Sequence, residues 1–162
     1  MKHLKYILLL IVVLFETYFI GIGSTLLKDI PQCDEGILML FRYDCIISVF
    51  HGLQPIWQEQ IVSMLHVDFI FILVYTFLLL LWSYLEMQQQ RSVWLNELLR
   101  LNILLGILAA VADCIENMIL LHDFSIPVRT IYQPDVFSFI KWGCIGWIVV
   151  VLLMSRVPRF FA

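Results

Sequence analysis

The chain has 162 residues, of which 62% are hydrophobic and 14% charged, with a formal net charge of −3. Soluble domains have about 45–50% apolar and about 25% charged residues, so this composition excludes an ordinary soluble domain. The charge offers no basic surface for nucleic acid, and the sequence contains no phosphate-binding glycine loop and no His-Glu-x-x-His zinc motif. We expect a single membrane domain over residues 1–162, with no evident cofactor.

Four segments are apolar and long enough to cross a bilayer, which requires about 20 mostly apolar residues. The predicted spans cover residues 6–23, 61–85, 101–121 and 137–154. We expect the first segment to remain as a span and not to be removed as a signal peptide, because Glu16 interrupts its apolar core and no small-x-small cleavage site follows. The predicted fold is all-α, a bundle of transmembrane helices.

The connection between the first two spans contains one further predicted helix, over about residues 36–51. Asp44, Ser48 and His51 recur at helical spacing among apolar residues, a pattern typical of an amphipathic helix that lies in the membrane interface. Gly52 and Pro55 are expected to end this helix.

The four cysteines separate into two pairs. Cys33 and Cys45 lie in the proposed outer connection and are candidates for a disulfide, because that side of the membrane is oxidising. Cys114 and Cys144 lie within spans, where they are expected to be small packing residues.

Basic residues predict the orientation, because cytoplasmic loops carry an excess of Lys and Arg. If the termini are inside, six basic residues fall on the inner side and four on the outer side. The inner six are Lys2, Lys5, Arg91, Arg100, Arg156 and Arg159, and the outer four are Lys28, Arg42, Arg129 and Lys141. Both termini are therefore predicted to be cytoplasmic.

Carboxylates occur inside the spans at closely matched depths. With a rise of about 1.5 Å per residue, Asp113 lies eight residues below the outer end of the third span. Asp68 lies seven residues below the outer end of the second span, and Glu16 lies seven residues from Gly23 in the first. Lys141 enters the fourth span from the same side. An ionisable group at the centre of a span costs about 2.5–3.5 kcal/mol even on the lenient insertion scale, which indicates a functional site.

Helical spacing places further polar residues on the same faces. Asp113, Glu116 and Asn117 share one face of the third span, and Asp68 and Tyr75 share one face of the second. Tyr75 could donate a hydrogen bond to the carboxylates above it. Since four carboxylates at one depth cannot all be ionised and unpaired, some must be protonated, bound to a cation or paired with Lys141.

A stripe of small residues continues the same face of the third span. Gly106, Ala109 and Ala110 predict that another helix approaches closely here. The third span is therefore expected to be central, with the polar site above and tight packing below.

Three motifs resemble a family of small bacterial four-span membrane proteins that has no assigned activity. The motifs are "CDEGILMLF" at 33–41, "VDFIFILVY" at 67–75 and "ADCIEN" at 112–117. The resemblance covers roughly residues 30–122. We expect a bacterial inner membrane location. The resemblance implies that one set of residues belongs together: Asp68, Tyr75, Asp113, Glu116 and Asn117.

Three functions fit these observations. We favour a binding or accessory protein that holds a lipid, an amine or a cation, with a site formed by Asp68, Tyr75, Asp113, Glu116, Asn117, Glu16 and Lys141. A metal at Asp68, Asp113 and Glu116 would be a hard cation, because the ligands are oxygens. The partners expected are the bilayer and, for an oligomer or accessory subunit, a second membrane chain.

The two alternatives are a homo-oligomeric pore and an intramembrane enzyme. A pore would use the carboxylates as a cation-selective ring. An enzyme would use Asp113 or Glu116 as a proton donor to an apolar substrate. The inner half of the spans is mostly apolar, which argues against a wide permanent pore but not against a gated one. No serine or cysteine is paired with a histidine at the depth and on the face of the carboxylates, which argues against an enzyme.

Overall fold

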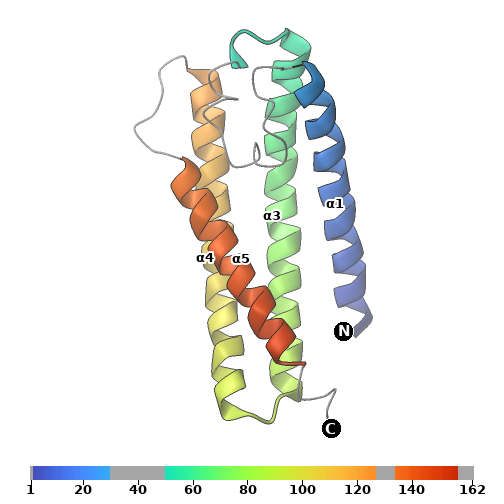
Figure 1. Ribbon diagram of the computed structural model, residues 1–162, viewed down its shortest axis with the longest axis vertical. Helices are drawn as coiled ribbons and strands as arrows, with labels where there is room; N and C mark the ends of the chain where they lie inside the picture. Colours follow the sequence, from blue (N-terminus) through green and yellow to red (C-terminus); the bar gives the residue numbers. More distant parts are fainter. Residues whose placement is uncertain (1, 30–49, 127–133, 157–162) are drawn as a thin grey trace.

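The computed structural model describes residues 2–29, 50–126 and 134–156, and these residues form four long helices (Figure 1). The helices are α1 (Lys2–Asp29), α3 (Pro55–Gln89), α4 (Val93–Ser125) and α5 (Pro134–Met154). No strand occurs in these ranges, so the prediction of an all-α fold is confirmed. All four helices are long and apolar enough to cross a membrane, and each contains one of the predicted spans.

The helices extend beyond the predicted spans. The second predicted span, 61–85, lies inside a helix of 35 residues, and the third, 101–121, lies inside one of 33 residues. A helix of this length is about 50 Å long, whereas the hydrocarbon core of a bilayer is about 30 Å thick. The additional helix length consists of polar turns at the helix ends. These turns continue the helical hydrogen bonding, but a prediction of spans from hydropathy leaves them out.

A three-residue turn, Gln90 to Ser92, joins α3 to α4 and makes the two helices antiparallel. The side-chain Oε1 of Gln90 accepts hydrogen bonds from the backbone N–H groups of Arg91 (3.1 Å) and Ser92 (3.5 Å). The beginning of α1 and the end of α5 lie toward the same end of the bundle as this turn (Figure 1). This arrangement agrees with a chain that crosses the membrane an even number of times.

Helix α4 is central, packing against both α3 and α5. Gly106 allows this close approach, because a Cβ there would lie 3.3 Å from Leu80 Cδ2 of α3 and 3.9 Å from Ile148 Cδ1 of α5. Ala109, one turn along, is fully buried. The predicted close approach is therefore confirmed at Gly106 and Ala109, whereas Ala110, the third residue of the predicted stripe, lines an open groove.

The core below the middle of the bundle is apolar. Leu99 of α4 packs with Ile148, Val151 and Leu152 of α5, and all four side chains are buried. Side chains of α3, Leu79 among them, pack against this cluster. Hydrocarbon side chains therefore fill most of the bundle at this level, and the buried Asn102 of α4 donates a hydrogen bond from Nδ2 to the carbonyl oxygen of Ile148 (3.4 Å).

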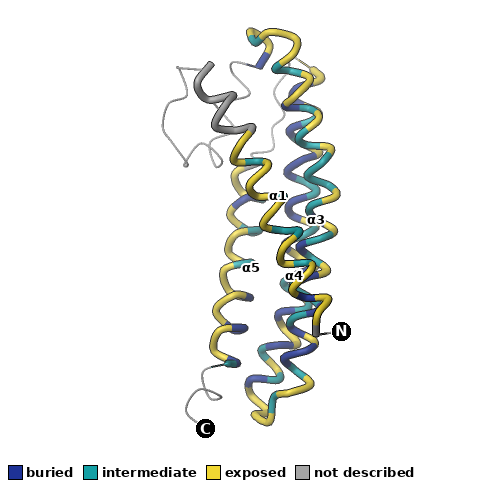
Figure 2. Tube along the Cα trace, turned by 90° about the vertical axis from the view of Figure 1, so that its right-hand side faces the viewer, coloured by how far each residue is buried: buried dark blue, intermediate teal, exposed yellow. Residues whose placement is uncertain are grey.

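Helix α1 is peripheral and packs against α3. Only 6% of the residues in the apolar stretch of α1 are buried, compared with 28–33% in the apolar stretches of the other three helices. Its contact with α3 is aromatic, since the rings of Phe15 and Phe19 lie 5.5 and 5.7 Å from the ring of Phe71. Exposed residues occur along every helix (Figure 2), and many of them are large apolar side chains, as expected for surfaces that face lipid.

The predicted interfacial helix, 36–51, lies outside the described residues except for Phe50 and His51. The Phe50 ring is buried and stacks on Phe124 of α4, with centroids 4.1 Å apart. Gln58 Nε2 donates hydrogen bonds to the carbonyl oxygens of Phe50 (2.9 Å) and Leu53 (3.2 Å). These contacts fix the chain that enters α3 against the end of α4.

Candidate functional site

One lysine lies at the centre of the polar residues inside the bundle. Lys141 Nζ of α5 donates a hydrogen bond to Asp113 Oδ1 (2.8 Å) and lies 3.1 Å from Glu116 Oε2. Both carboxylates belong to α4 and are at most 4% exposed. Tyr75 of α3 donates to Asp113 Oδ2 (2.8 Å), and Ser138 of α5 donates to Glu116 Oε1 (2.9 Å). We call these five residues the Lys141 cluster.

The Lys141 cluster fixes the rotation of three helices. A buried charge must be paired and hydrogen-bonded, because an isolated ion in a medium of low dielectric is very costly. Here two carboxylates of α4 can be satisfied only when Lys141 and Ser138 of α5 and Tyr75 of α3 all point toward them. The predicted hydrogen bond from Tyr75 to a carboxylate is confirmed.

Asp68 forms a separate pair beside this cluster. Asn117 Nδ2 donates a hydrogen bond to Asp68 Oδ2 (2.7 Å), which joins α4 to α3. Asp68 is half-buried, and no Lys, Arg or His among the described residues lies within ion-pair distance of it. Its charge interacts with those of Asp113, Glu116 and Lys141 through space. Asp68 is therefore a carboxylate at the edge of a strongly charged region, without a cation of its own in the described structure.

Glu16 of α1 is the least integrated of the predicted site residues. It is exposed and makes no hydrogen bond or ion pair with any described residue, although its charge interacts with those of Lys141 and Asp113. The structure thus places six of the seven predicted residues in two neighbouring hydrogen-bonded groups and leaves Glu16 beside them. The first group contains Tyr75, Asp113, Glu116 and Lys141, and the second is the pair of Asp68 and Asn117.

A metal ion is not supported by this geometry. Lys141 already occupies the space between Asp113 and Glu116, where a cation shared by the two carboxylates would lie. Within the described ranges no group of three or more His, Cys, Asp or Glu side chains is arranged to hold a metal ion. The hard cation considered for Asp68, Asp113 and Glu116 therefore has no preformed site in this part of the chain.

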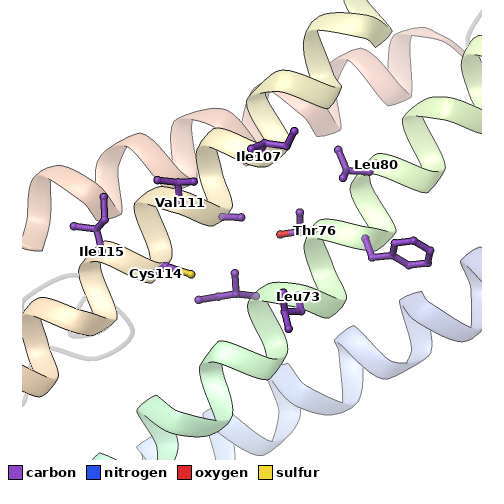
Figure 3. A pocket seen from close by; sticks show the side chains of 10 residues that line it. Leu73, Thr76, Leu80, Ile107, Val111, Cys114 and Ile115 are labelled. Carbon is purple, nitrogen blue, oxygen red and sulfur yellow. The ribbon is translucent and has the colours of Figure 1, made fainter.

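An apolar groove runs between α3 and α4 (Figure 3). It has a volume of about 430 Å³, and its lining is almost entirely hydrocarbon. Two polar groups border it, the Thr76 hydroxyl and the Cys114 thiol. The Thr76 Oγ1 atom is buried and has no hydrogen-bond partner among the described residues. The groove is therefore an open apolar surface between two helices, with one hydroxyl that has no partner among the described residues.

Asp68 lies on the helix face that leads into this groove. Ile72, Thr76 and Leu80 all line the groove, and Asp68 is four residues before Ile72, so these residues form one stripe along α3. A carboxylate therefore lies one helical turn beyond the apolar lining. This juxtaposition is suited to a molecule that has a cationic head and an apolar tail.

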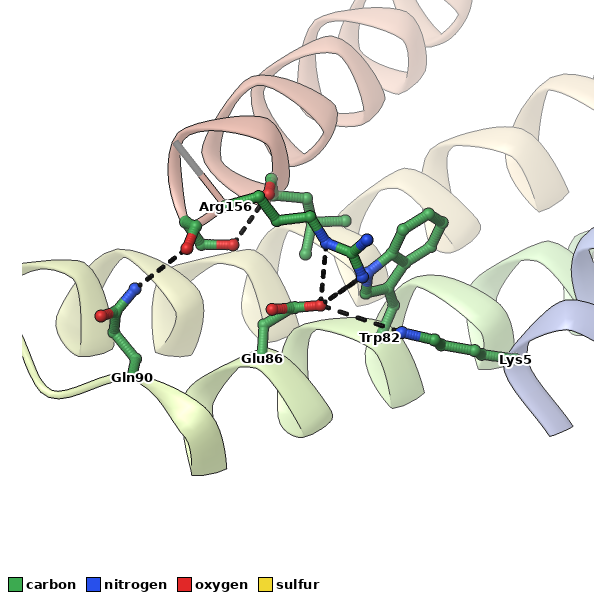
Figure 4. Close-up of polar contacts among 7 residues, drawn as sticks. Lys5, Trp82, Glu86, Gln90 and Arg156 are labelled. Atoms are coloured by element: carbon green, nitrogen blue, oxygen red, sulfur yellow. Dashed lines mark hydrogen bonds and ion pairs between the residues drawn. The ribbon is translucent and has the colours of Figure 1, made fainter. Parts of the chain in front are cut away.

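A second polar cluster, which the sequence analysis did not identify, lies near the other end of the bundle (Figure 4). The buried Glu86 of α3 accepts hydrogen bonds at Oε1 from Arg156 Nη2 (2.7 Å), Arg156 Nε (3.2 Å) and Trp82 Nε1 (3.2 Å). Lys5 Nζ of α1 lies 3.9 Å from the same oxygen. We call Lys5, Trp82, Glu86 and Arg156 the Glu86 cluster.

The sequence contained one signal for the Glu86 cluster. Glu86 directly follows the predicted span 61–85, and Lys5 and Arg156 both belong to the inner basic residues. The positions of the basic residues and the direction of the second span thus indicate the same end of the bundle for all three. They do not indicate a contact, because Lys5, Glu86 and Arg156 belong to three separate parts of the chain.

Neither cysteine in the described spans is in a disulfide. Cys114 borders the groove and Cys144 is buried, and both are free thiols. The disulfide candidates Cys33 and Cys45 lie outside the described residues.

Comparisons with models of protein families, with curated proteins and with solved structures found no match to this chain. The resemblance to bacterial four-span proteins thus rests on its three short motifs, and the function must be argued from the residues themselves.

Proposed function

We propose that this membrane protein binds an amphipathic amine, a molecule with a cationic amine head and a hydrocarbon tail. The ammonium group would lie against Asp68, and the tail would occupy the groove between α3 and α4. One observation carries the proposal: Asp68 has no cationic partner among the described residues and lies on the same face of α3 as the apolar groove.

The charge of the region favours a cation over an anion. Asp68, Asp113, Glu116 and Glu16 supply four carboxylates, and Lys141 is the cation that interacts with them in the described structure. If all were ionised, the formal charge would be −4 + 1 = −3. An anionic head would be repelled from such a site, whereas an ammonium group beside Asp68 would reduce the excess negative charge.

The shape of the groove favours an organic ligand over an inorganic ion. Small-molecule sites are typically concave and mostly apolar, with volumes of about 300–1,000 Å³ and a few polar groups that fix orientation. The groove has about 430 Å³. Its unsatisfied Thr76 hydroxyl could hydrogen-bond a polar atom of a ligand, such as a carbonyl oxygen near the head.

The test compares three probes that share a dodecyl tail: dodecylamine, dodecyl sulfate and dodecyl maltoside. Binding to the purified full chain would be followed by thermal unfolding and by native mass spectrometry. At a concentration of 100 times its Kd, a ligand stabilises the folded state by about 2.7 kcal/mol. We expect dodecylamine, and not the neutral probe, to stabilise the wild type, and Asp68→Asn to abolish the difference.

Two control variants separate the head site from the tail site. Glu97→Gln removes an exposed carboxylate of α4 that pairs with Arg100, and it should leave dodecylamine binding unchanged. Ala110→Phe fills the groove, whereas Leu108→Phe enlarges a side chain on an exposed face of α4. Only Ala110→Phe should weaken binding. Equal responses to all three probes, or unchanged amine binding in Asp68→Asn, would contradict the proposal.

The two alternative functions have less support. A pore would require a polar path along the bundle, and the core formed by Leu99, Ile148, Val151 and Leu152 is hydrocarbon. An enzyme would require a proton donor that can reach a substrate, whereas Asp113 and Glu116 are both held by hydrogen bonds inside the Lys141 cluster. Binding needs neither a path nor a free acid.

For the location we propose a bacterial inner membrane with both termini in the cytoplasm. The six-to-four distribution of basic residues supports this orientation. The start of α1 and the end of α5 lie toward the same end of the bundle (Figure 1), which agrees with both termini on one side of the membrane. The peripheral helix α1, with its large exposed apolar surface, is the surface we propose for a second copy or an accessory subunit. Cysteine labelling from each side of the membrane, in cells, tests the orientation.

A further inference from the structure

We propose that the Glu86 cluster binds the phosphate of an anionic phospholipid, at the end of the bundle opposite the Lys141 cluster. The site would be formed by Lys5 of α1 and Arg156 after α5, with Trp82 and Glu86 of α3 holding both cations in place. This inference does not depend on the proposed amine site.

The first observation is a charge imbalance. Lys5 and Arg156 contribute two positive charges and Glu86 contributes one negative charge, so the named groups sum to 2 − 1 = +1. One cation balances the charge of one buried carboxylate. A second cation at the same oxygen leaves positive charge available for an anion.

The second observation concerns unused hydrogen-bond donors. The Lys5 side chain is only 10% exposed, and its ammonium group makes no hydrogen bond to a described residue, with 3.9 Å separating it from Glu86 Oε1. Arg156 uses Nε and Nη2 for Glu86, and its Nη1 makes no hydrogen bond to a described residue. Arg156 is also 36% exposed. Phosphate oxygens are strong acceptors for such donors.

The third observation is the position of the cluster along the helices. Lys5 lies three residues after the start of α1, Glu86 three residues before the end of α3, and Arg156 two residues after the end of α5. At about 1.5 Å per residue, all three lie within about 5 Å of a helix end. Headgroup phosphates occupy this level, and interfacial Trp residues are enriched there.

The indole of Trp82 completes the arrangement. Lys5 Nζ lies 5.6 Å and Arg156 Cζ 5.5 Å from the centre of the Trp82 ring, distances typical of cation–π contacts. Both cations therefore lie against one aromatic ring, which also donates a hydrogen bond to Glu86. These contacts set the separation of the two cations before any lipid arrives.

The test is native mass spectrometry of the full chain with phosphatidylglycerol or phosphatidylcholine of the same acyl chains. We expect the wild type to retain more phosphatidylglycerol than phosphatidylcholine. Lys5→Gln should weaken the binding of phosphatidylglycerol about fivefold, the effect of one basic residue near an anionic headgroup, and leave phosphatidylcholine unchanged. Lys5→Arg should keep most of the preference.

Arg100→Gln is the matched control, because Arg100 is exposed and near the same end of the bundle. It should leave both lipids unaffected. Equal retention of the two lipids by the wild type would overturn the proposal, and this comparison needs no variant to fold. An equal loss in Lys5→Gln and Arg100→Gln would also overturn it. The proposal would also be overturned if inorganic phosphate displaced phosphatidylglycerol at a phosphate concentration similar to that of the lipid, because the site would then be one for free phosphate.

Discussion

Removing the ammonium group of Lys141 is the sharpest test of the Lys141 cluster. In Lys141→Met the side chain keeps much of its volume, while Asp113 and Glu116 lose the group that lies 2.8 and 3.1 Å from them. Breaking a buried ion pair by removing one partner costs about 3–5 kcal/mol, since the remaining charge is buried without compensation. We expect the variant to be destabilised by an amount in this range.

The expected magnitude is large enough to measure by thermal unfolding. For a chain of this size, each kcal/mol lowers the Tm by about 2–4 °C, so Lys141→Met should lower it by at least about 6 °C. The matched control is Arg100→Met, which breaks the exposed pair with Glu97, in which both side chains are more than half exposed. Exposed pairs contribute about 0–1 kcal/mol, so the control should change the Tm little.

A compensating variant separates lost charge pairing from lost packing. Adding Asp113→Asn and Glu116→Gln to Lys141→Met removes the uncompensated carboxylates, and neutral replacement of a buried ion cluster is often nearly neutral for stability. We expect the triple variant to recover most of the lost Tm. The reasoning is refuted if Lys141→Met unfolds no earlier than Arg100→Met, or if the triple variant is no more stable than the single one.

Three further predictions concern the packing of the helices and the hydrogen bond from Tyr75. Gly106→Leu should destabilise the bundle by about 1–3 kcal/mol. Gly106→Ala should be tolerated, because the nearest atom is the movable end of Leu80. The thermal unfolding of the two variants tests this difference. Tyr75→Phe leaves an acceptor of Asp113 without its donor and should cost about 1–3 kcal/mol, measured in the same way. Ile148→Ala creates a cavity in the apolar core and should cost about 2–5 kcal/mol, with no change in dodecylamine binding.

Part of the candidate site could be read from the sequence because depth and helical face are local properties. Counting residues from the span ends placed Asp68 and Asp113 at one level, and spacing of three and four placed Glu116 and Asn117 beside Asp113. The contacts follow this layout closely, with Asn117 on Asp68 and Tyr75 on Asp113. In a membrane helix, length and rise fix the depth before any neighbour is present.

The pairing of Lys141 could not be read in the same way. Glu16, Asp113 and Glu116 were all eligible partners, because they lie at similar depth in their spans. Lys141 contacts the two carboxylates of α4 and not Glu16, because α5 packs on α4 whereas α1 packs on α3. Which helices are neighbours is a property of the bundle and not of any single span.

The sequence by itself determined that four apolar segments cross the membrane and that carboxylates lie inside them, since both depend only on length, hydropathy and helical rise. Only the tertiary structure decided how those charges are paired, that a groove runs beside Asp68, and that Glu86 meets Arg156 and Lys5. The physical reason is that pairing requires particular rotations of helices about their axes and particular neighbours, and these are selected by close packing at Gly106 and by the need to satisfy every buried charge at once.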